Sequence, residues 1–300
     1  LGLFLYDHIG GRRKLPPTRS IDLARHPAGA PLQPQYAKGF EYSDGWVDDA
    51  RLVMLNVREA ADRGARIKTR TRADLRLVED GLWVVEATGA NGQAYRFTGR
   101  SLVNAAGPAV LDLLRRAAAP PDYQMRLVRG SHIVVRKLFD HDFAYFFQLP
   151  DGRIFFAIPY ERDFTLIGTT DQDHEGSLAD VHASAEEIAY LCEGANQYFA
   201  AQIGPDDVVW TYSGVRPLVE DGSGKPEAAT RGYRIDLDME EGAPLLTIYG
   251  GKITSYRHVA EHAVDDLAAH VAALTGARWN GRAPLPGGDF RTDGAAALQA

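Results

Sequence analysis

Cysteine is almost absent from the sequence, since Cys192 is the single example in 300 residues. One thiol cannot form an intramolecular disulfide or a cysteine-rich metal site, and this usage fits a reducing compartment. Long apolar runs are absent too, because none approaches the roughly 18 residues of a membrane span. No signal peptide is visible, since the basic residues 12–14 follow the apolar start instead of preceding it. The sequence therefore predicts neither a disulfide scaffold nor a membrane-spanning segment.

A surplus of basic residues is also missing, and the net charge is −7. This charge provides no general attraction to nucleic acid or to anionic lipid, so we expect no nucleic-acid partner. Any anion site must therefore come from a local cluster of basic side chains. The apolar share of 45% is ample for a buried core. The chain begins without Met and within a helical pattern, so we expect it to be a piece of a longer protein.

The stretch IYGGKITSYR has the pattern of a strand that stops at two glycines and opens a helix. Residues 244–249 form a short apolar run, Gly250 and Gly251 break it, and helical spacing resumes from Thr254 to Ala268. Such a joint presents unpaired backbone N–H groups to an anionic or electron-rich group, and Lys252 adds a positive charge there. A plain strand-to-helix turn with a surface lysine explains the stretch equally well. It is not a P-loop, because the first glycine and the final Ser or Thr of that motif are both missing.

The first 120 residues predict helices and strands that end in a second joint of this kind. An apolar helix opens the chain and packs on its own domain in preference to a membrane surface. An amphipathic helix begins at Asp48 or Asp49 and stops at Gly64. Strand-like segments follow, separated by turn signals at residues 79–81 and 91–92. Residues 101–106 then lead through Gly107 into a helix over 109–118, the arrangement found beneath bound nucleotides.

From residue 126 onward the pattern changes to longer alternating strands, which predict an antiparallel sheet. A helix over 183–199 follows, and the strand-glycine-helix pattern returns only after residue 244. We therefore predict a mixed α/β fold in which a Rossmann-like cofactor domain is split by a sheet-rich substrate domain. The predicted domains are residues 1–120 and 244–283 for the cofactor, 121–243 for the substrate, and 284–300 for the start of a further domain.

Three basic residues form the candidate chemistry. Arg216 lies in SGVRPL, where Gly214 and Pro217 hold the backbone at a predicted strand end, and Arg231 and Lys252 follow. A guanidinium suits bidentate binding of phosphate or carboxylate, and lysine supplies a compact charge. If the three converge, they bind a phosphorylated substrate and stabilise charge near its oxygen. Taken singly, each is more often a surface cation.

Two further motifs have a functional and a structural interpretation. His132, in RGSHIVV, is a candidate general base, although a lone histidine in a strand is more often a structural residue. Asp171 and Asp173 in TTDQDHEG stop short of the calcium-loop pattern, so we predict a turn and no metal site.

Seven motifs occur in this order along the chain: GFEYSDGWVDDARL, IKTRTRA, LVNAAGP, RGSHIVV, IGTTD, WTYSGVRPL and IYGGKITSYR. Together they resemble one family, the FAD-dependent, quinone-linked glycerol-3-phosphate dehydrogenases of aerobic metabolism. The resemblance runs from residue 1 to about 288, and its last two motifs are more specific than any single glycine motif. More broadly it is similar to the amino-acid-oxidase-like flavoproteins, which place an SGVRP-type arginine at the substrate and a glycine-rich turn beneath the flavin.

The resemblance implies residues for FAD and for substrate. Lys252, with its neighbouring N–H donors, stabilises the negative charge of the reduced flavin, and also reaches a substrate hydroxyl. Arg216 and Arg231 bind the substrate phosphate, and His132 is the candidate base. The residues expected to contact FAD are Arg72 through its backbone, Ala106, Gly107, Gly250, Gly251, Lys252, Ile253 and Thr254.

The implied reaction is oxidation of sn-glycerol 3-phosphate to dihydroxyacetone phosphate, with hydride transfer from C2 to flavin N5 and loss of the hydroxyl proton. The electrons then pass to quinone, which places the full-length protein in the cytoplasm as a peripheral protein on the inner face of the membrane. A homodimer is compatible with the resemblance. An oxidase that uses O2, and a non-catalytic binding module, remain as alternatives.

One feature departs from the family pattern. The family opens with a βαβ unit that carries G-x-G-x-x-G and an acidic ribose ligand, and no such motif occurs in this sequence. We therefore expect a chain truncated at both ends that alone retains FAD weakly or not at all and does not turn over.

Overall fold

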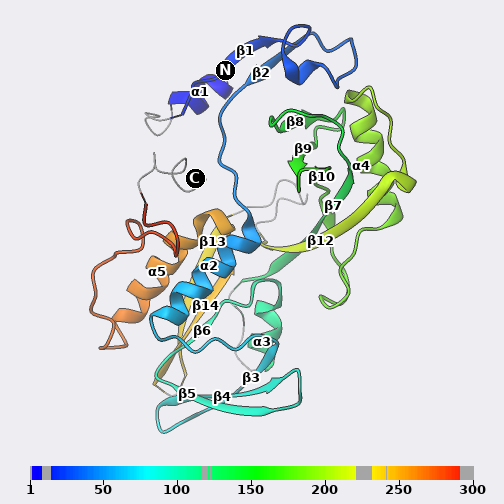
Figure 1. The fold of residues 1–300 in the computed structure, drawn as a ribbon. Helices are drawn as coiled ribbons and strands as arrows, with labels where there is room; N and C mark the ends of the chain where they lie inside the picture. Colours follow the sequence, from blue (N-terminus) through cyan, green and yellow to red (C-terminus); the bar gives the residue numbers. More distant parts are fainter. Residues whose placement is uncertain are drawn as a thin grey trace. The chain divides into compact units, whose positions relative to one another are not determined.

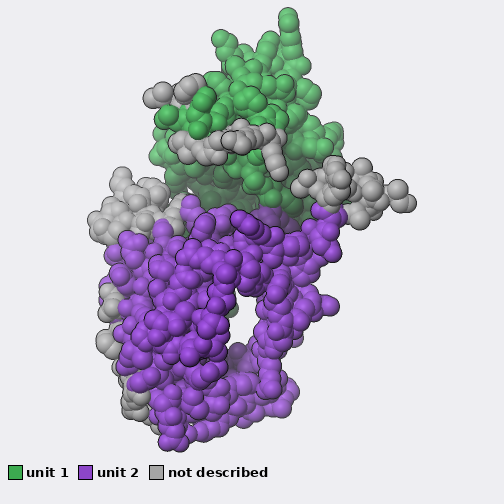
Figure 2. Space-filling view, turned by 90° about the vertical axis from the view of Figure 1, so that its left-hand side faces the viewer, with its two compact units in different colours: residues 1–46, 127–216 green, residues 47–126, 217–300 purple. Residues whose placement is uncertain are grey.

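The computed structural model describes residues 2–8, 15–116, 121, 123–220, 232–240 and 242–290 (Figure 1). The chain divides into two compact units, coloured separately in Figure 2. Unit 1 consists of residues 1–46 and 127–216, and unit 2 of residues 47–126 and 217–300. Among the described helices, none combines the length and the apolar character that a bilayer-crossing segment needs.

A six-stranded sheet forms the centre of unit 1. Its strand order is β11-β7-β10-β9-β8, and β12 pairs with β7 on a separate branch. The β10–β7, β10–β9, β8–β9 and β11–β7 pairs are all antiparallel, as the alternating apolar pattern predicted. The bounds are β7 Met125–Arg136, β8 Tyr145–Gln148, β9 Ile154–Tyr160, β10 Phe164–Gly168, β11 Gln172–Asp173 and β12 Val208–Val219.

One face of this sheet is covered by α4 (Ala185–Tyr198), which follows β11 in the chain. Ser184 begins α4 in a capping box with Glu187, so the helix start is held by reciprocal hydrogen bonds. Leu191, Cys192 and Ala195 of α4 pack against alternate strand residues in the main hydrophobic core. Because successive side chains of a strand point to opposite faces, every second side chain of these strands lies on the face away from α4. We call this opposite side the open face.

The N-terminal segment of unit 1 is attached at the end of α4. Leu32 forms a β-bridge with Phe199, and the Tyr36 hydroxyl donates to the carbonyl of Gln197 at 2.9 Å. This grouping of residues 1–46 with the sheet differs from the predicted domain boundaries, since contacts distant in sequence decide it. The remaining elements of unit 1 are α1 Gly2–His8, β1 Arg19–Asp22, η1 Pro27–Gly29, β2 Lys38–Glu41 and η3 Pro205–Asp207.

Unit 2 contains two three-stranded sheets with the orders β3-β4-β5 and β13-β14-β6. The β14 and β6 strands are parallel, and β13 pairs antiparallel with β14. The Trp83 indole donates to the carbonyl of Pro244 at 2.9 Å and so joins the two sheets inside a shared core. The bounds are α2 Asp49–Asp62, β3 Thr71–Glu79, β4 Leu82–Gly89, β5 Ala94–Gly99, β6 Leu102–Asn104, η2 Gly107–Ala109, α3 Val110–Arg116, β13 Tyr233–Glu240, β14 Ala243–Gly250, η5 Ile253–Ser255 and α5 Tyr256–Ala268.

The mixed α/β fold with an antiparallel sheet is confirmed, and so is the α2 start, where the Asp48 side chain accepts from the N–H of Arg51. Two local predictions are wrong. The segment of residues 171–173 (DQD) is not a turn, because Gln172 and Asp173 form the short strand β11 against β7. Arg216 does not stand at a strand end, because β12 continues to Val219. In both places pairing with β7 or continuation of a long strand overrides the local turn signal.

Candidate functional site

Arg216 is fixed on the open face of unit 1 by three consecutive residues that follow β10. Its guanidinium donates to the Thr169 hydroxyl at 3.0 Å, the Thr170 carbonyl at 3.3 Å and the Asp171 carboxylate at 2.7 Å. The Asp171 bond is also an ion pair, in which the Arg216 side chain is 30% exposed and the Asp171 side chain 16%. A planar guanidinium held at several points is pre-oriented for a bidentate anion.

Two glycines make room for the side chains of the open face. A Cβ atom on Gly130 would lie 2.4 Å from a terminal nitrogen of Arg216, so the guanidinium covers the β7 backbone at that residue. A Cβ atom on Gly168 would lie 2.1 Å from the His132 ring, which covers the β10 backbone opposite it. Gly130 and His132 are two residues apart on β7 and share one face. Arg216 and His132 are therefore neighbours on the open face of unit 1.

The His132 ring is held flat by an aromatic neighbour. It stacks on the ring of Tyr212 in β12, with centroids 4.8 Å apart and an angle of 10° between the ring planes. The Tyr212 residue is itself 42% exposed, so the stacked pair lies at the surface of unit 1. The structure thus places the predicted candidate base beside the predicted phosphate ligand, and a stacked ring is restricted in the directions along which it exchanges a proton.

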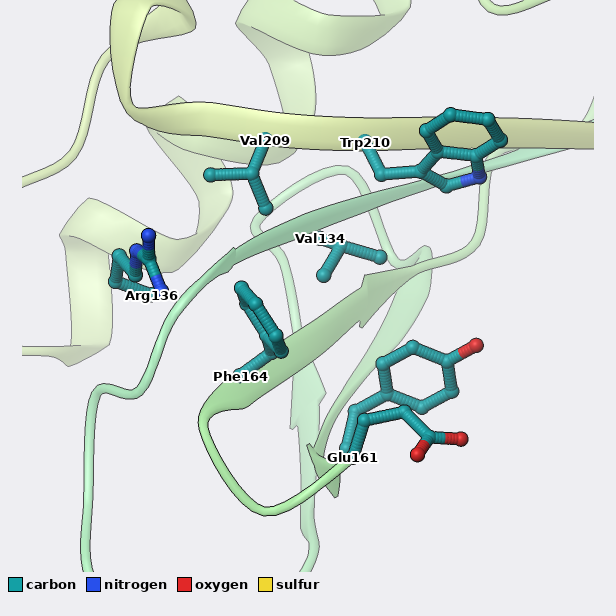
Figure 3. A pocket seen from close by; sticks show the side chains of 7 residues that line it. Val134, Arg136, Glu161, Phe164, Val209 and Trp210 are labelled. Carbon is teal, nitrogen blue, oxygen red and sulfur yellow. The ribbon is translucent and has the colours of Figure 1, made fainter.

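An apolar hollow continues the open face beyond the His132 ring. It has a volume of ≈ 400 Å³ (Figure 3). Val134 and Arg136 line the hollow from β7, on the same face of the strand as His132. Trp210 lines it from β12, on the same face as Tyr212, and is 67% exposed. Figure 3 shows Phe164 and Glu161 on the β10 side of the hollow. The open face therefore passes from a charged end at Arg216 through the stacked His132 to an apolar end.

Replacing Gly130 with alanine is expected to displace Arg216 without unfolding the protein. The added Cβ would collide with the flexible end of the Arg216 side chain rather than with backbone, so the side chain gives way. We expect the KM for the predicted phosphorylated substrate to rise about tenfold, which corresponds to roughly 1.4 kcal/mol, with an unchanged melting temperature. Gly214→Ala on β12 is the matched control, since nothing lies within 4 Å of its Cβ position. Equal KM values for the two variants would contradict this placement of Arg216.

The second candidate site is the glycine joint of unit 2, at the end of β14. Gly250 has a φ of +71° and Gly251 a φ of +93°, which favour glycine. The Gly251 N–H donates to the Gly232 carbonyl at 3.1 Å, so it is not one of the unpaired N–H groups predicted at this joint. The exposed Lys252 is the N-cap residue of η5, and its side chain makes no capping hydrogen bond. The N–H groups of Ile253 and Thr254, at the start of η5, have no acceptor within the helix.

The joint after β6 lies beside it in the same sheet. Leu245, Leu246 and Thr247 of β14 pair in parallel with β6, so the carboxyl ends of the two strands lie at one edge. The buried Asn104 side chain donates to the Val110 carbonyl at 3.1 Å and accepts from the Ala106 N–H at 3.3 Å, which holds the turn. Gly107 has a φ of +55° at the start of η2.

This edge fits a dinucleotide cofactor by its donor set. Two adjacent parallel strands each end in a glycine turn that opens a helix, and Lys252 supplies the positive charge. A side chain at Gly251 would be crowded, since a Cβ atom there would lie 3.3 Å from the Tyr233 side chain. Arg72 lies in the other sheet of unit 2, opposite Thr88, and its contact with FAD stays a prediction. Arg231 lies outside the described residues.

Sequence reasoning missed several residues that form these sites. Asp171 was assigned to a turn, and its partner Arg216 is 45 residues away in the chain. Thr169, Tyr212 and Asn104 lie inside the quoted motifs IGTTD, WTYSGVRPL and LVNAAGP, but the motifs were not used to assign them a contact. Among the residues the structure describes, no group of three His, Cys, Asp or Glu side chains is arranged to hold a metal ion.

These features define a class of protein, an α/β flavoprotein with a sheet-rich second unit, and the chain belongs to the FAD dependent oxidoreductase family, which matches residues 5–257. It is 50% identical over 292 residues to the D-erythritol 1-phosphate dehydrogenase of Brucella abortus, covering 97% of this chain and 58% of that protein. It is 44% identical over 296 residues to the aerobic glycerol-3-phosphate dehydrogenase of Escherichia coli. That match covers 98% of this chain and 58% of the Escherichia coli protein. The chain thus spans 58% of the length of each of these two relatives.

A solved structure supports the same assignment. The fold is similar to the crystal structure of the glycerol-3-phosphate dehydrogenase from Bacillus halodurans complexed with FAD, with a TM-score of 0.74 and 27% identity. The similarity covers 90% of this chain and 52% of that chain. The family resemblance stated from the motifs is confirmed by these comparisons.

Proposed function

We propose that the native protein oxidises sn-glycerol 3-phosphate to dihydroxyacetone phosphate with FAD as its cofactor. The observation that carries the proposal is the pair of neighbours on the open face, a guanidinium at Arg216 and an imidazole at His132. The Arg216 guanidinium covers Gly130, which precedes His132 by two residues on β7, a step of roughly 6.6 Å along a strand. That spacing matches a small polyol phosphate, whose phosphate and reacting hydroxyl are separated by a short carbon chain.

Each residue has a defined task in this reaction. Arg216 binds the phosphate and sets the position of the substrate, with Arg231 as a second ligand that the family resemblance implies. His132 accepts the proton of the substrate hydroxyl at its imidazole, in the ring plane that Tyr212 maintains. Bound FAD supplies the hydride acceptor. Lys252 and the N–H groups after it hold negative charge at the cofactor, and Arg72, Ala106, Gly107, Gly250 and Gly251 line its binding site.

A second candidate substrate is D-erythritol 1-phosphate, because the relative from Brucella abortus that is 50% identical bears the name of that activity. Both compounds are polyol monophosphates, and erythritol has one more carbon and one more hydroxyl. The phosphate contact at Arg216 serves either compound, so the discrimination lies in the part of the site that receives the extra carbon. The ratio of kcat/KM for the two substrates decides between them.

We propose quinone as the electron acceptor, with the protein in the cytoplasm as a peripheral protein on the inner face of the membrane, and a homodimer as its assembly. The similarity to an aerobic dehydrogenase supports this acceptor. The alternatives are an oxidase that reduces O2 and a binding module without turnover. Stoichiometric peroxide on addition of substrate identifies the oxidase, and substrate binding without flavin identifies the module.

The decisive experiment is an absorbance spectrum between about 350 and 500 nm of the purified native protein with FAD. Anaerobic glycerol 3-phosphate and, separately, D-erythritol 1-phosphate are then added. We expect a flavin band that bleaches with one of them and returns on addition of a quinone analogue. A flavin band that neither substrate bleaches would contradict the proposal. The same spectrum of residues 1–300 alone tests the expectation that this chain retains FAD weakly or not at all.

A further inference from the structure

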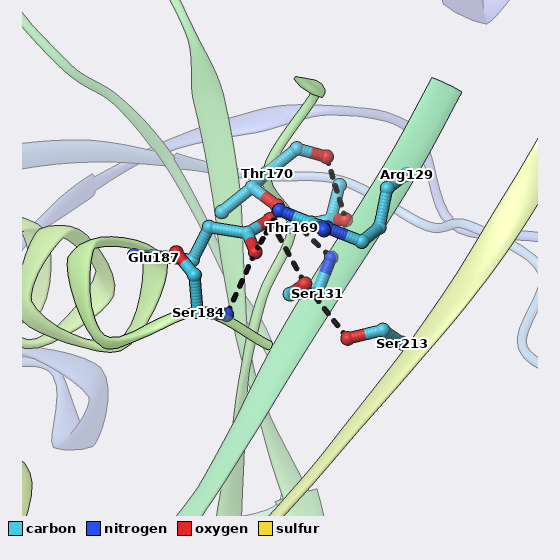
Figure 4. A network of polar contacts seen from close by, with 7 residues as sticks. All are labelled: Arg129, Ser131, Thr169, Thr170, Ser184, Glu187 and Ser213. Carbon is cyan, nitrogen blue, oxygen red and sulfur yellow. Dashed lines mark hydrogen bonds and ion pairs between the residues drawn. The ribbon is translucent and has the colours of Figure 1, made fainter. Parts of the chain in front are cut away.

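A buried carboxylate, that of Glu187, lies beneath the sheet on the side opposite Arg216. Glu187 stands on the first turn of α4 and is only 4% exposed. One carboxylate oxygen accepts from the Ser131 hydroxyl at 2.9 Å and from the Thr170 hydroxyl at 2.6 Å. The other accepts from the Ser184 N–H at 3.0 Å and forms an ion pair with Arg129 at 2.9 Å (Figure 4). Four groups therefore satisfy one buried carboxylate.

Helix capping accounts for only part of this arrangement. The capping box uses the Ser184 N–H and one oxygen of Glu187. The second oxygen bonds to Ser131 on β7 and to Thr170, which follows the end of β10 by two residues. Burial raises the pKa of the Glu187 carboxyl, but the hydrogen bonds from Ser184, Thr170 and Ser131 and the charge of Arg129 outweigh it and hold this pKa below its usual value. Glu187 therefore carries its charge at neutral pH.

Thr170 connects this carboxylate to the candidate site. The Thr170 hydroxyl donates to Glu187 and accepts from the Ser131 N–H at 3.0 Å. These two bonds hold Thr170 from the covered face of the sheet. Its carbonyl accepts from Arg216 at 3.3 Å, and its neighbours Thr169 and Asp171 provide the other two bonds to the guanidinium. These three partners of Arg216 are thus consecutive residues, and the middle one is bonded to Glu187.

A second connection reaches the strand that carries Arg216. The hydroxyls of Ser131 and Ser213 are 2.8 Å apart, and Figure 4 shows Ser213 at this end of the network. Because the Ser131 hydroxyl donates its one hydrogen to Glu187, the Ser213 hydroxyl donates to Ser131. Glu187 thereby fixes β7, and through it β12 three residues before Arg216. Fully satisfied networks of this kind favour one arrangement of the backbone over alternatives.

We propose that Glu187 is a positioning residue for Arg216, and that it sets the affinity of the open face for the phosphate of the substrate. This proposal rests on the function proposed above. Glu187 does not touch the substrate, because it lies on the covered face of the sheet. It acts through Thr170 and through the Ser131–Ser213 pair, which hold the partners and the strand of the guanidinium in place.

The test is the kinetics of Glu187→Gln in the native FAD-loaded protein. An amide keeps the volume but replaces one acceptor oxygen with a donor, so the four contacts cannot all be retained. We expect KM for the phosphorylated substrate and the inhibition constant of inorganic phosphate to rise about tenfold together, with kcat within about twofold and an unchanged flavin spectrum. Glu186→Gln is the matched control, since its exposed side chain is the neighbour in the same helical turn. We expect wild-type constants for this control.

Loss of stability alone gives a different pattern. It lowers the melting temperature and the amount of active enzyme, which reduces the apparent kcat, and it leaves KM and the phosphate constant unchanged. That pattern for Glu187→Gln overturns the proposal. If the variant does not fold, Thr170→Val and Thr170→Ser provide the second test. Val removes the link to Glu187 and should raise KM, and Ser restores the hydroxyl and should recover most of the lost affinity. Equal constants for this pair also overturn the proposal.

Failure of the inference is distinguishable from failure of the proposed function. If Arg216→Ala raises KM and Glu187→Gln does not, Arg216 binds the phosphate without depending on Glu187, and only the inference fails. If Arg216→Ala leaves KM and the phosphate constant unchanged, the phosphate site itself is misassigned and the proposed function loses its main support.

Discussion

Replacing Arg216 with alanine is expected to raise KM for glycerol 3-phosphate about 100-fold, because hydrogen bonds to charged groups contribute roughly 1.5–3 kcal/mol. The loss has a second source. Asp171 is left with a carboxylate that no longer faces its 2.7 Å partner and that repels the phosphate. The effect falls on KM rather than on kcat if the phosphate contact is equal in the ground and transition states. Steady-state kinetics with saturating electron acceptor measures both constants.

Two further variants sharpen this result. Arg136→Ala removes an exposed guanidinium from the same side of β7 that carries Gly130, and we expect wild-type KM for this control. The double variant Arg216→Ala with Asp171→Asn removes the unpaired carboxylate and should recover part of the loss. A double variant no better than Arg216→Ala would show that repulsion by Asp171 is negligible. An unchanged KM in Arg216→Ala would remove this arginine from the substrate site.

Replacing Lys252 with methionine is expected to lower kcat about 10²–10³-fold, the effect of removing one group that stabilises charge formed during a reaction. Lys252 follows the Gly250–Gly251 turn at the edge where the strands β14 and β6 end together. In the proposed site this positive charge would stabilise the reduced, negatively charged cofactor, so we expect its loss to make the reduction potential of bound FAD more negative. Rapid reduction by substrate under anaerobic conditions and a redox titration of the bound flavin measure the two effects separately.

The matched control is Lys68→Met, which changes the same residue type within unit 2 where the ammonium group lies 4.4 Å from the centre of the Tyr95 ring. We expect wild-type kcat and potential for this control. If Lys252→Met retains both the wild-type kcat and the wild-type potential, Lys252 is a surface lysine at a strand-to-helix turn. That was the plain interpretation of the glycine joint.

Local signals were sufficient for most secondary-structure elements. The Asp48 cap, the turn glycines Gly81 and Gly92, and the alternating apolar residues of β9 each specify their structure through neighbours a few residues away. Such signals fail where a distant strand competes. The DQD segment has turn residues, but pairing with β7 extends it as β11, because ladder hydrogen bonds offset the local preference.

The candidate sites divide in the same manner. Arg216, His132 and Lys252 were found from residue type and motif, and the structure gives each a defined position in its own unit. The contacts that orient Arg216 were not found, because Asp171 is 45 residues away and the link from Ser131 to Glu187 spans 56 residues. The sequence shows the capping box of Glu187 as Ser184-x-x-Glu. It does not show that the other carboxylate oxygen bonds to Ser131 and Thr170, which are distant along the chain.

By itself the sequence determined the family, the mixed α/β class and the identity of the basic residues, because these depend on residue type, on spacing and on motifs read along the chain. Only the tertiary structure decided that Gly130 and Gly168 make room for Arg216 and His132, and that Glu187 bonds to Thr170, whose carbonyl accepts from Arg216. The physical reason is that a hydrogen bond or a steric fit depends on atoms brought together by strand pairing. The register of that pairing is set by the whole core rather than by the residues near the site.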